Sequence, residues 1–375
     1  MKSNSVNLTD RCKSFVKQYN DIKNQLFTKD MLKQLADLGF LGWMIPASSG
    51  GQGKTAQDIV QAGETLMIHC ENLGIVLSWV IHEIVTTWFI NGFGSDQQKQ
   101  LYLPALIKGD LLGSVAISEP DVGPHPKFLK TYARSDHQNI VLNGEKTFLT
   151  NGPIADIYVV IAISKVRENR KFYSAYIIHE NNQGLTRTKP LPIPFVQTSP
   201  HGGIIMNDCL MSNDQLLGES NTAYEKMVKP FREIEDILMM GPILGGLCCQ
   251  INRSVQYINT SSITLDKEQL ILLGNLKSHI ITLRVIAHKA SQLLDEHNHS
   301  TEMVALLVAF RQWAANFQHY HAQLCDQLSI VDNHLSHLSN DLCGIGKVAL
   351  KIMLNKQMNI GKNILVNHVV PSPKV

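Results

Sequence analysis

The acidic residues within 233–236 are of a type that can transfer protons in catalysis. Glu233, Glu235 and Asp236 are followed directly by the apolar run from Ile237 to Gly241. A carboxylate held in apolar surroundings has a raised pKa and becomes a better base near neutral pH. One interpretation is therefore a catalytic base among these carboxylates. The other is the solvated first turn of a helix, where acidic residues interact favourably with the helix dipole.

Two further segments combine hydroxyl residues with turn-forming residues. They are the run from Val115 to Gly123 (VAISEPDVG) and the run from Leu142 to Gly152 (LNGEKTFLTNG). Taken singly, each is typical of surface turns, because Glu-Pro, Asn-Gly and similar pairs favour turns. Taken together, they resemble the (T/S)-E-P-x-x-G and L-N-G-x-K-x-(W/F/Y)-I-T-N-G stretches of the flavin-binding middle domain of the acyl-CoA dehydrogenase family.

That resemblance implies FAD as the cofactor. It places the Thr150 hydroxyl near flavin N5, the Phe148 ring against the flavin, and Ser118 beside the pyrimidine end. Gly123 would let its loop approach the phosphates closely. The cofactor-binding residues implied in this way are Val115, Ala116, Ile117, Ser118, Gly123, Phe148, Leu149 and Thr150.

The reaction implied is α,β-dehydrogenation of an acyl thioester, in which the flavin accepts hydride because no side chain can. Most of the family places the base in a C-terminal Tyr-Glu-Gly-Thr segment, but the last glutamate of this chain is Glu302. The isovaleryl and long-chain branches place it in a helix resembling D-L-E-R-L-V-L-A-G. Glu235 falls on that base, and Asp236 replaces the following arginine.

The loop after Gly123 departs from the family pattern of Gly-Ser-Asp. Pro124 has neither a backbone N–H nor a hydroxyl, so it cannot donate to a phosphate. His125 and Lys127 either replace that donor as cations or belong to a stiffened surface loop. The predicted substrate-binding residues are Pro124, His125 and Asp236. A non-catalytic scaffold that binds a thioester or a partner protein is the alternative function.

Apolar periodicity predicts the elements that must position these residues. It is helical from about 8 to 108, strand-like from about 111 to 217, and helical again to 366, with long helices expected over 270–294 and 302–328. We therefore predict an N-terminal helical domain (1–110), a middle antiparallel β-barrel or sandwich (111–219) and a C-terminal helical bundle (220–375). Ser95 is a predicted N-cap, and Asn143-Gly144 and Asn151-Gly152 are predicted turns.

The bulk composition bounds the remaining expectations. A net charge of +2 over 375 residues gives no reason to expect nucleic acid as a partner. Seven cysteines without a CxxC pair, and no apolar N-terminal run, predict a cytoplasmic protein without a membrane span. The histidines between 297 and 337 lack the companion ligands of a metal site. The resemblance implies acyl-CoA or an acyl-carrier-protein thioester as substrate, an electron-accepting flavoprotein, and a homodimer or homotetramer.

Overall fold

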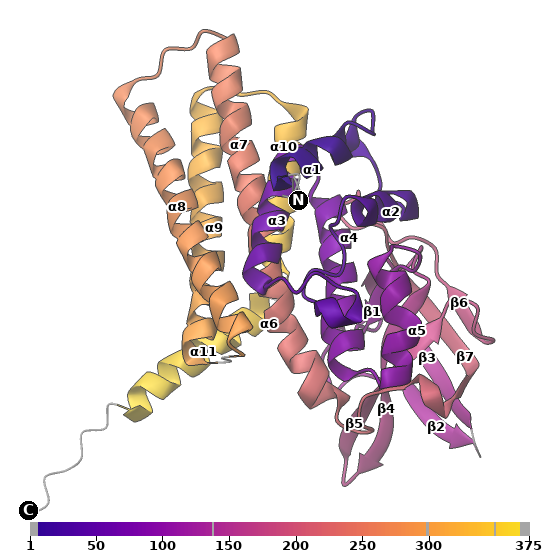
Figure 1. The fold of residues 1–375 in the computed structure, drawn as a ribbon. Coiled ribbons are helices and arrows are strands. Elements are labelled where there is room, and N and C mark those ends of the chain that lie inside the picture. Colours follow the sequence, from indigo (N-terminus) through magenta and orange to yellow (C-terminus); the bar gives the residue numbers. More distant parts are fainter. Residues whose placement is uncertain (1–6, 137–138, 298–299, 349, 368–375) are drawn as a thin grey trace, which may run out of the picture. The chain divides into compact units, whose positions relative to one another are not determined.

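The chain forms two compact units, residues 1–242 and 243–375, in a computed structural model that describes residues 7–136, 139–297, 300–348 and 350–367. The first unit contains helices α1 to α6 and the described strands, and the second contains most of α7 and helices α8 to α11 (Figure 1). Residues 220–242, which the predicted boundary at 219/220 assigns to the C-terminal bundle, cluster with the first unit.

Helices fill the N-terminal region, as its periodicity predicts. Gly39 and Gly42 follow α2 with φ of +72° and +69°, a conformation that glycine adopts without strain. Ser95 is confirmed as an N-cap, since its side chain accepts from the Gln98 N–H at 3.2 Å. The α-helices here are α1 (Leu8–Val16), α2 (Lys29–Asp37), α3 (Ala56–Cys70), α4 (Leu73–Ile84) and α5 (Asp96–Ile107); short 3₁₀ segments span Ile22–Asn24 and Ala47–Ser49, and α4 continues as a π-helical segment, Val85–Asn91.

Helix α4 links the helices to the strands. Its residues are buried on every side, and it packs against β1 (Gly113–Ala116) and β3 (Asn139–Thr150). The Asn151 side chain, just beyond β3, donates from Nδ2 to the Ser78 carbonyl of α4 at 2.9 Å. A buried amide held in this way fixes the end of β3 against the helix.

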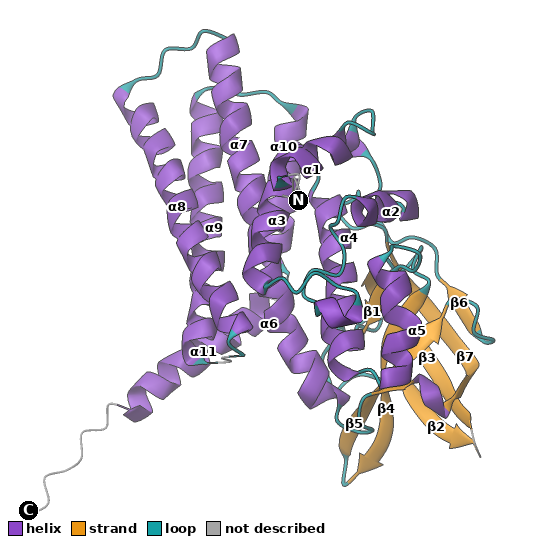
Figure 2. Ribbon diagram, viewed as in Figure 1, coloured by secondary structure: helices purple, strands orange, loops and turns teal. Residues whose placement is uncertain are grey.

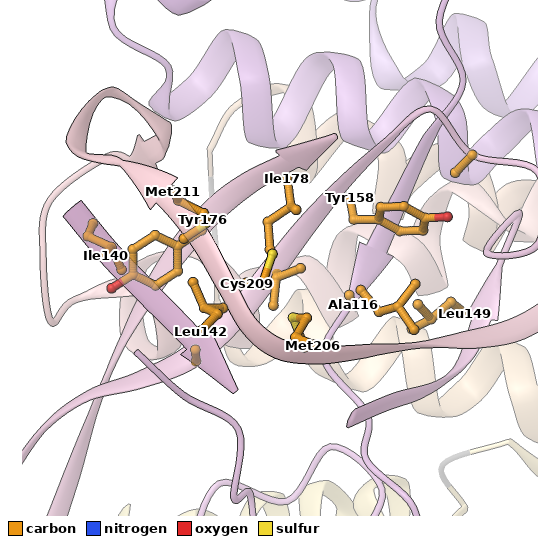
Figure 3. Packing of buried hydrophobic residues seen from close by; sticks show 14 residues of the cluster. Ala116, Ile140, Leu142, Leu149, Tyr158, Tyr176, Ile178, Met206, Cys209 and Met211 are labelled. Atoms are coloured by element: carbon orange, nitrogen blue, oxygen red, sulfur yellow. The ribbon is translucent and has the colours of Figure 1, made fainter. Parts of the chain in front are cut away.

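The strands form one mixed sheet in the order β6-β7-β3-β2-β4-β5-β8, with β1 paired to β4 (Figure 2). Most pairings are antiparallel, as predicted, whereas β1 and β2 pair with β4 in parallel. Alternate side chains enclose an apolar core that includes Tyr158, Tyr176 and Met206 (Figure 3). The other strands are β2 (Tyr132–Asp136), β4 (Ile157–Arg167), β5 (Arg170–His179), β6 (Leu185–Arg187), β7 (His201–Ser212) and β8 (Leu216–Leu217).

The predicted turn at Asn143-Gly144 is wrong, because both residues lie inside β3. The pairing with β7 shifts register between Leu142 and Gly144, which marks a β-bulge. Gly144 has φ +142°, and a Cβ there would lie 2.5 Å from Thr131 Oγ1. Glycine is therefore needed for close backbone approach within a strand rather than for a hairpin.

Long helices complete the second unit, and the predicted spans of 270–294 and 302–328 correspond to α8 and α9. α9 packs against α8, α10 and α11. The helices beyond the sheet are α6 (Lys229–Leu238), which follows a π-helical segment at Tyr224–Val228, then α7 (Met240–Thr260), α8 (Lys267–Asp295), α9 (Thr301–Gln327), α10 (Asn333–Lys347) and α11 (Leu350–Asn367).

Within the part of the chain that the structure describes, three helical stretches could cross a membrane by length and composition alone: Leu73–Asn91, Tyr224–Thr260 and Lys267–Asp295. The first buries 89% of its apolar window inside the protein, which accounts for its composition as a core helix. Lys267–Asp295 buries only 33% of its window, so α8 presents much of its apolar surface to the outside.

Candidate functional site

The two sequence segments singled out above meet side by side in the structure. The Thr147 N–H donates to the Ser118 carbonyl at 2.9 Å, and the Ser114 hydroxyl donates to the Thr150 carbonyl at 2.7 Å. These bonds hold β1 and the residues that follow it along β3. The polar residues of both segments therefore belong to one small region of the first unit.

Side chains alternate between the two faces of these strands. Ala116 and Leu149 point into the β core, and Figure 3 shows them together at one end of the cluster. Because successive side chains of a strand point to opposite faces, Val115 and Thr150 lie on the other face, where both are half-buried. Ala116 and Leu149, and the buried Ile117, can therefore offer an outside ligand only their main chains.

Phe148 stands out on this face. Its φ is +58°, a rare conformation for a bulky residue, and the β3–β7 register shifts between Lys146 and Leu149. The bulge turns the Phe148 ring outward, so that 58% of the residue is exposed. Strained backbone that exposes an aromatic ring beside a hydroxyl is typical of a binding site.

A buried ion pair holds the two segments together. Lys146 Nζ lies 2.9 Å from Glu119 Oε1 and donates to the Ile117 carbonyl at 3.0 Å. Glu119 also accepts from the Thr131 and Lys130 backbone N–H groups at 2.9 and 2.6 Å. Burial disfavours the Glu119 carboxylate, but the Lys146 ammonium and these donors outweigh it and hold the pKa of Glu119 below its ordinary value.

Sequence reasoning assigned no role to Glu119 or Lys146, although both belong to the two motifs. A lysine and a glutamate 27 positions apart carry no spacing signal, and lysine is almost never fully buried. The pair fixes the loop from Glu119 to Thr131 against β3. The two motifs therefore include a structural clamp, the Glu119–Lys146 ion pair, as well as residues that face outward.

The loop beyond Glu119 folds back on itself. Glu119 and Gly123 exchange backbone hydrogen bonds of 3.1 and 3.0 Å, and Gly123 has φ +59° with open space where a Cβ would stand. Pro124 and His125 are exposed, and the His125 ring packs on Phe128 at 4.9 Å. Their assignment to a substrate site stays a prediction.

Glu235 and Asp236 lie on α6 with a cation between them. Arg232 Nη1 is 2.9 Å from Glu235 Oε2, and Nη2 is 3.0 Å from Asp236 Oδ1. Burial opposes the guanidinium charge, but the two carboxylates outweigh it and raise the pKa of Arg232 above its ordinary value. Arg232 is thus a cation three positions before Glu235, whereas the family pattern has its arginine one position after the base.

Two expectations about this helix change. α6 begins at Lys229, so Glu235 and Asp236 lie beyond its first turn, and Asp236 is buried. The interpretation of a solvated first turn is therefore wrong. The apolar surroundings expected for a base also differ from those observed, because the Arg232 guanidinium contacts the Glu235 carboxylate.

His201 is a residue that the sequence did not suggest. It lies opposite Thr150 across the β3–β7 pairing, and its Nε2 is 3.2 Å from Thr150 Oγ1. It is 51 positions from Thr150 and belongs to neither motif, so only the strand register brings the two together.

The histidines near the C-terminus are not all exposed. His321 on α9 is buried, its Nε2 lies 3.0 Å from Ser254 Oγ, and burial lowers its pKa to about 4. Among the residues that the structure describes, no group of three or more His, Cys, Asp or Glu side chains is placed to hold a metal ion.

Comparison with known protein families places both motifs within one matched domain, the second of the two described next. Residues 8–110 match the acyl-CoA dehydrogenase N-terminal domain, and residues 114–209 match the acyl-CoA dehydrogenase middle domain. A curated relative, L-prolyl-[peptidyl-carrier protein] dehydrogenase from Pseudomonas fluorescens, is 27% identical over 238 residues, or 63% of this chain and 62% of the relative. The alignment thus spans less than two thirds of that relative's length.

Solved structures share the fold over almost the whole chain. The FAD complex of PigA has a TM-score of 0.82 at 18% identity and covers 98% of this chain and 99% of that one. Butyryl-CoA dehydrogenase from Megasphaera elsdenii has a TM-score of 0.80 at 21% identity and covers 96% and 99%. At these identities the likeness establishes the fold.

Proposed function

Because the chain belongs to the acyl-CoA dehydrogenase family, we propose that it is an FAD-dependent enzyme that oxidises an acyl thioester to the α,β-unsaturated thioester. The substrate loses an α-proton and a β-hydride, and FAD, when bound, supplies the hydride acceptor that side chains lack. Two comparisons support the proposal. One relative is named as a carrier-protein dehydrogenase, and one solved structure of similar fold is an FAD complex.

The observation that carries the cofactor assignment is the outward-facing Phe148 on its strained bulge beside the half-buried Thr150. An exposed aromatic ring favours a planar ligand, and the nearby hydroxyl can hydrogen-bond to its polar edge. We assign Phe148, Thr150, Ser118 and the main chain of Val115 to Ile117 to the flavin ring. At the phosphate end, the open space beside Gly123 fits a close approach, and His125 and Lys127 supply the donors that Pro124 lacks.

Glu235 is the proposed base for the α-proton. Arg232 fixes the position of its carboxylate, which is 20% exposed, and neutralises part of its charge. The negative charge that develops on the thioester carbonyl needs hydrogen-bond donors in place before the proton leaves. Asp236 and the exposed His125 complete the proposed substrate site.

The proposed substrate is an acyl thioester of coenzyme A or of a carrier protein, and the proposed electron acceptor is a separate flavoprotein. The described cysteines are all free thiols, which favours a reducing compartment and supports our expectation of a cytoplasmic protein. The competing proposal is a non-catalytic thioester-binding scaffold. It is favoured by the ion pair that engages the Glu235 carboxylate and by Pro124, which cannot donate a hydrogen bond to a phosphate.

The purified protein should show the visible absorption bands of a bound flavin, and an acyl thioester should bleach them in the absence of oxygen. Phe148→Ala should weaken FAD binding about fivefold or more, since an aromatic contact contributes about 1 kcal/mol beyond its burial. Tyr132→Ala, which changes another exposed aromatic of the same sheet, is the matched control and should bind FAD normally. A colourless protein that also fails to take up added FAD would support the scaffold.

We also propose a homodimer or homotetramer formed through the second unit. α8 exposes Ile271, Ile281 and Val285, and α11 exposes further apolar side chains. Contiguous apolar helix faces mark association surfaces. In sedimentation equilibrium the wild type should be oligomeric and Val285→Glu should shift it toward the monomer. Val331→Glu, at an exposed valine between helices, should leave the assembly unchanged; an oligomer that tolerates Val285→Glu would contradict the proposed face.

A further inference from the structure

The hydroxyl of Thr150 has a specific partner within the protein. His201 is 8% exposed and lies in register with Thr150, with its Nε2 3.2 Å from Thr150 Oγ1. The other ring nitrogen, Nδ1, lies 2.9 Å from the Ser199 carbonyl. The imidazole therefore bridges two fixed oxygens.

This geometry determines the tautomer of His201. A carbonyl oxygen can only accept, so Nδ1 must carry the hydrogen that it donates to Ser199. In the neutral ring Nε2 then has a lone pair and no hydrogen. Burial lowers the pKa of His201, which favours the neutral ring. The hydrogen in the Nε2–Oγ1 contact must consequently come from Thr150.

The Ser199 carbonyl is itself held in place from α4. Ser199 is 3% exposed, its Oγ lies 2.9 Å from Ser78 Oγ, and its N–H donates to the Val196 carbonyl at 2.9 Å. The ring of His201 cannot turn over without breaking a hydrogen bond to this anchored segment. The Nδ1–H tautomer is thus built into the fold.

A threonine hydroxyl has one hydrogen and two lone pairs. With its hydrogen donated to His201, Thr150 can offer only a lone pair to any molecule on the outer face. Oxidised flavin has an acceptor at N5, whereas the flavin that has received a hydride carries N–H there. A hydroxyl restricted to accepting interacts favourably with the second form and not with the first.

We propose that His201 is a positioning residue that sets the Thr150 hydroxyl as a hydrogen-bond acceptor and thereby raises the reduction potential of the bound flavin. The inference rests on the proposed function, because it takes the flavin to lie beside Thr150. FAD, when bound, would supply the acceptor for the β-hydride, and Glu235 would take up the α-proton. His201 exchanges no proton in this step.

The test is the midpoint potential of FAD bound to the full chain, measured by reductive titration against a reference dye. His201→Leu should weaken the preference for reduced flavin about tenfold, a fall of about 30 mV for a two-electron couple. His201→Gln, which can again offer an acceptor to Thr150, should recover most of the shift. His179→Leu, at a histidine of the same sheet that contacts Tyr102, should leave the potential unchanged.

A purely structural role would not depend on Thr150. Thr150→Val should lower the potential by itself, and His201→Leu should add nothing in that background, because residues that act through one contact are non-additive. An equal shift by His201→Leu with and without the hydroxyl would overturn the proposal.

A flavin-free measurement separates this inference from the proposed function. Nitrogen-15 NMR of the apoprotein should show His201 as the Nδ1–H tautomer, and an Nε2–H tautomer would overturn the proposal whatever the flavin does. Failure to bind FAD at all would instead refute the proposed function and the inference with it.

Discussion

Glu235→Gln should lower thioester oxidation about a thousandfold or more while the flavin absorption and the folded state remain as in the wild type. A carboxamide cannot take up the α-proton, and a positioned general base typically contributes between a hundredfold and ten-thousandfold to the rate. Folding should survive because Arg232 keeps Asp236, 3.0 Å away, as its second partner. The measurement is kcat with an electron-accepting dye, together with the visible spectrum.

Glu233→Gln is the matched control, because it makes the same glutamate-to-glutamine change two residues before Glu235 on the same helix. It should retain activity close to that of the wild type. Equal loss in both variants would indicate a general disturbance of α6, and full activity of Glu235→Gln would exclude Glu235 as the base. Inactivity of a flavin-loaded wild type toward every thioester would favour the scaffold.

The elements with strong periodicity were predictable because their apolar spacing directly reflects a buried face. α8 and α9 follow the predicted spans, and the Ser95 cap depends only on residues three positions apart. The Asn143-Gly144 turn failed because local propensity cannot show that a glycine is needed for contact with Thr131, which lies on another segment. Close approach between segments is a tertiary property.

The residues of the candidate site also divide into those that local sequence motifs identify and those that only the tertiary structure brings together. Thr150 and Ser118 were found because they lie in motifs, and the strand pairing brings those motifs together. His201 was missed because only the register of β7 places it opposite Thr150. The role of Arg232 was predictable from the sequence, since residues three and four positions apart on a helix are neighbours. Its spacing from Glu235 and Asp236 predicts the observed ion pairs.

Lys146→Met should destabilise the first unit by about 3–5 kcal/mol, the cost of leaving one member of a buried ion pair without its partner. Glu119 would stay buried at 4% exposure with only N–H donors around it. The loop from Glu119 to Thr131 would loosen, and FAD affinity should fall with it. Denaturant unfolding followed by circular dichroism gives the stability, and Lys130→Met, at an exposed lysine of the same loop, should unfold like the wild type.

Acid should reveal the same pair in the unmodified protein. Because the pKa of Glu119 is lower in the folded state than its ordinary 4.5, the carboxylate stabilises the fold above about that pH, and the contribution is lost as the pH falls through the folded value. The variant carrying both Glu119→Gln and Lys146→Met has no such carboxylate, so its stability should fall less steeply below pH 5. It should also recover part of what Lys146→Met loses, since removing both charges removes the unpaired one. Parallel acid profiles for the wild type and the double variant would show that the clamp contributes little, and the motif would then have to be explained by its outward-facing residues alone.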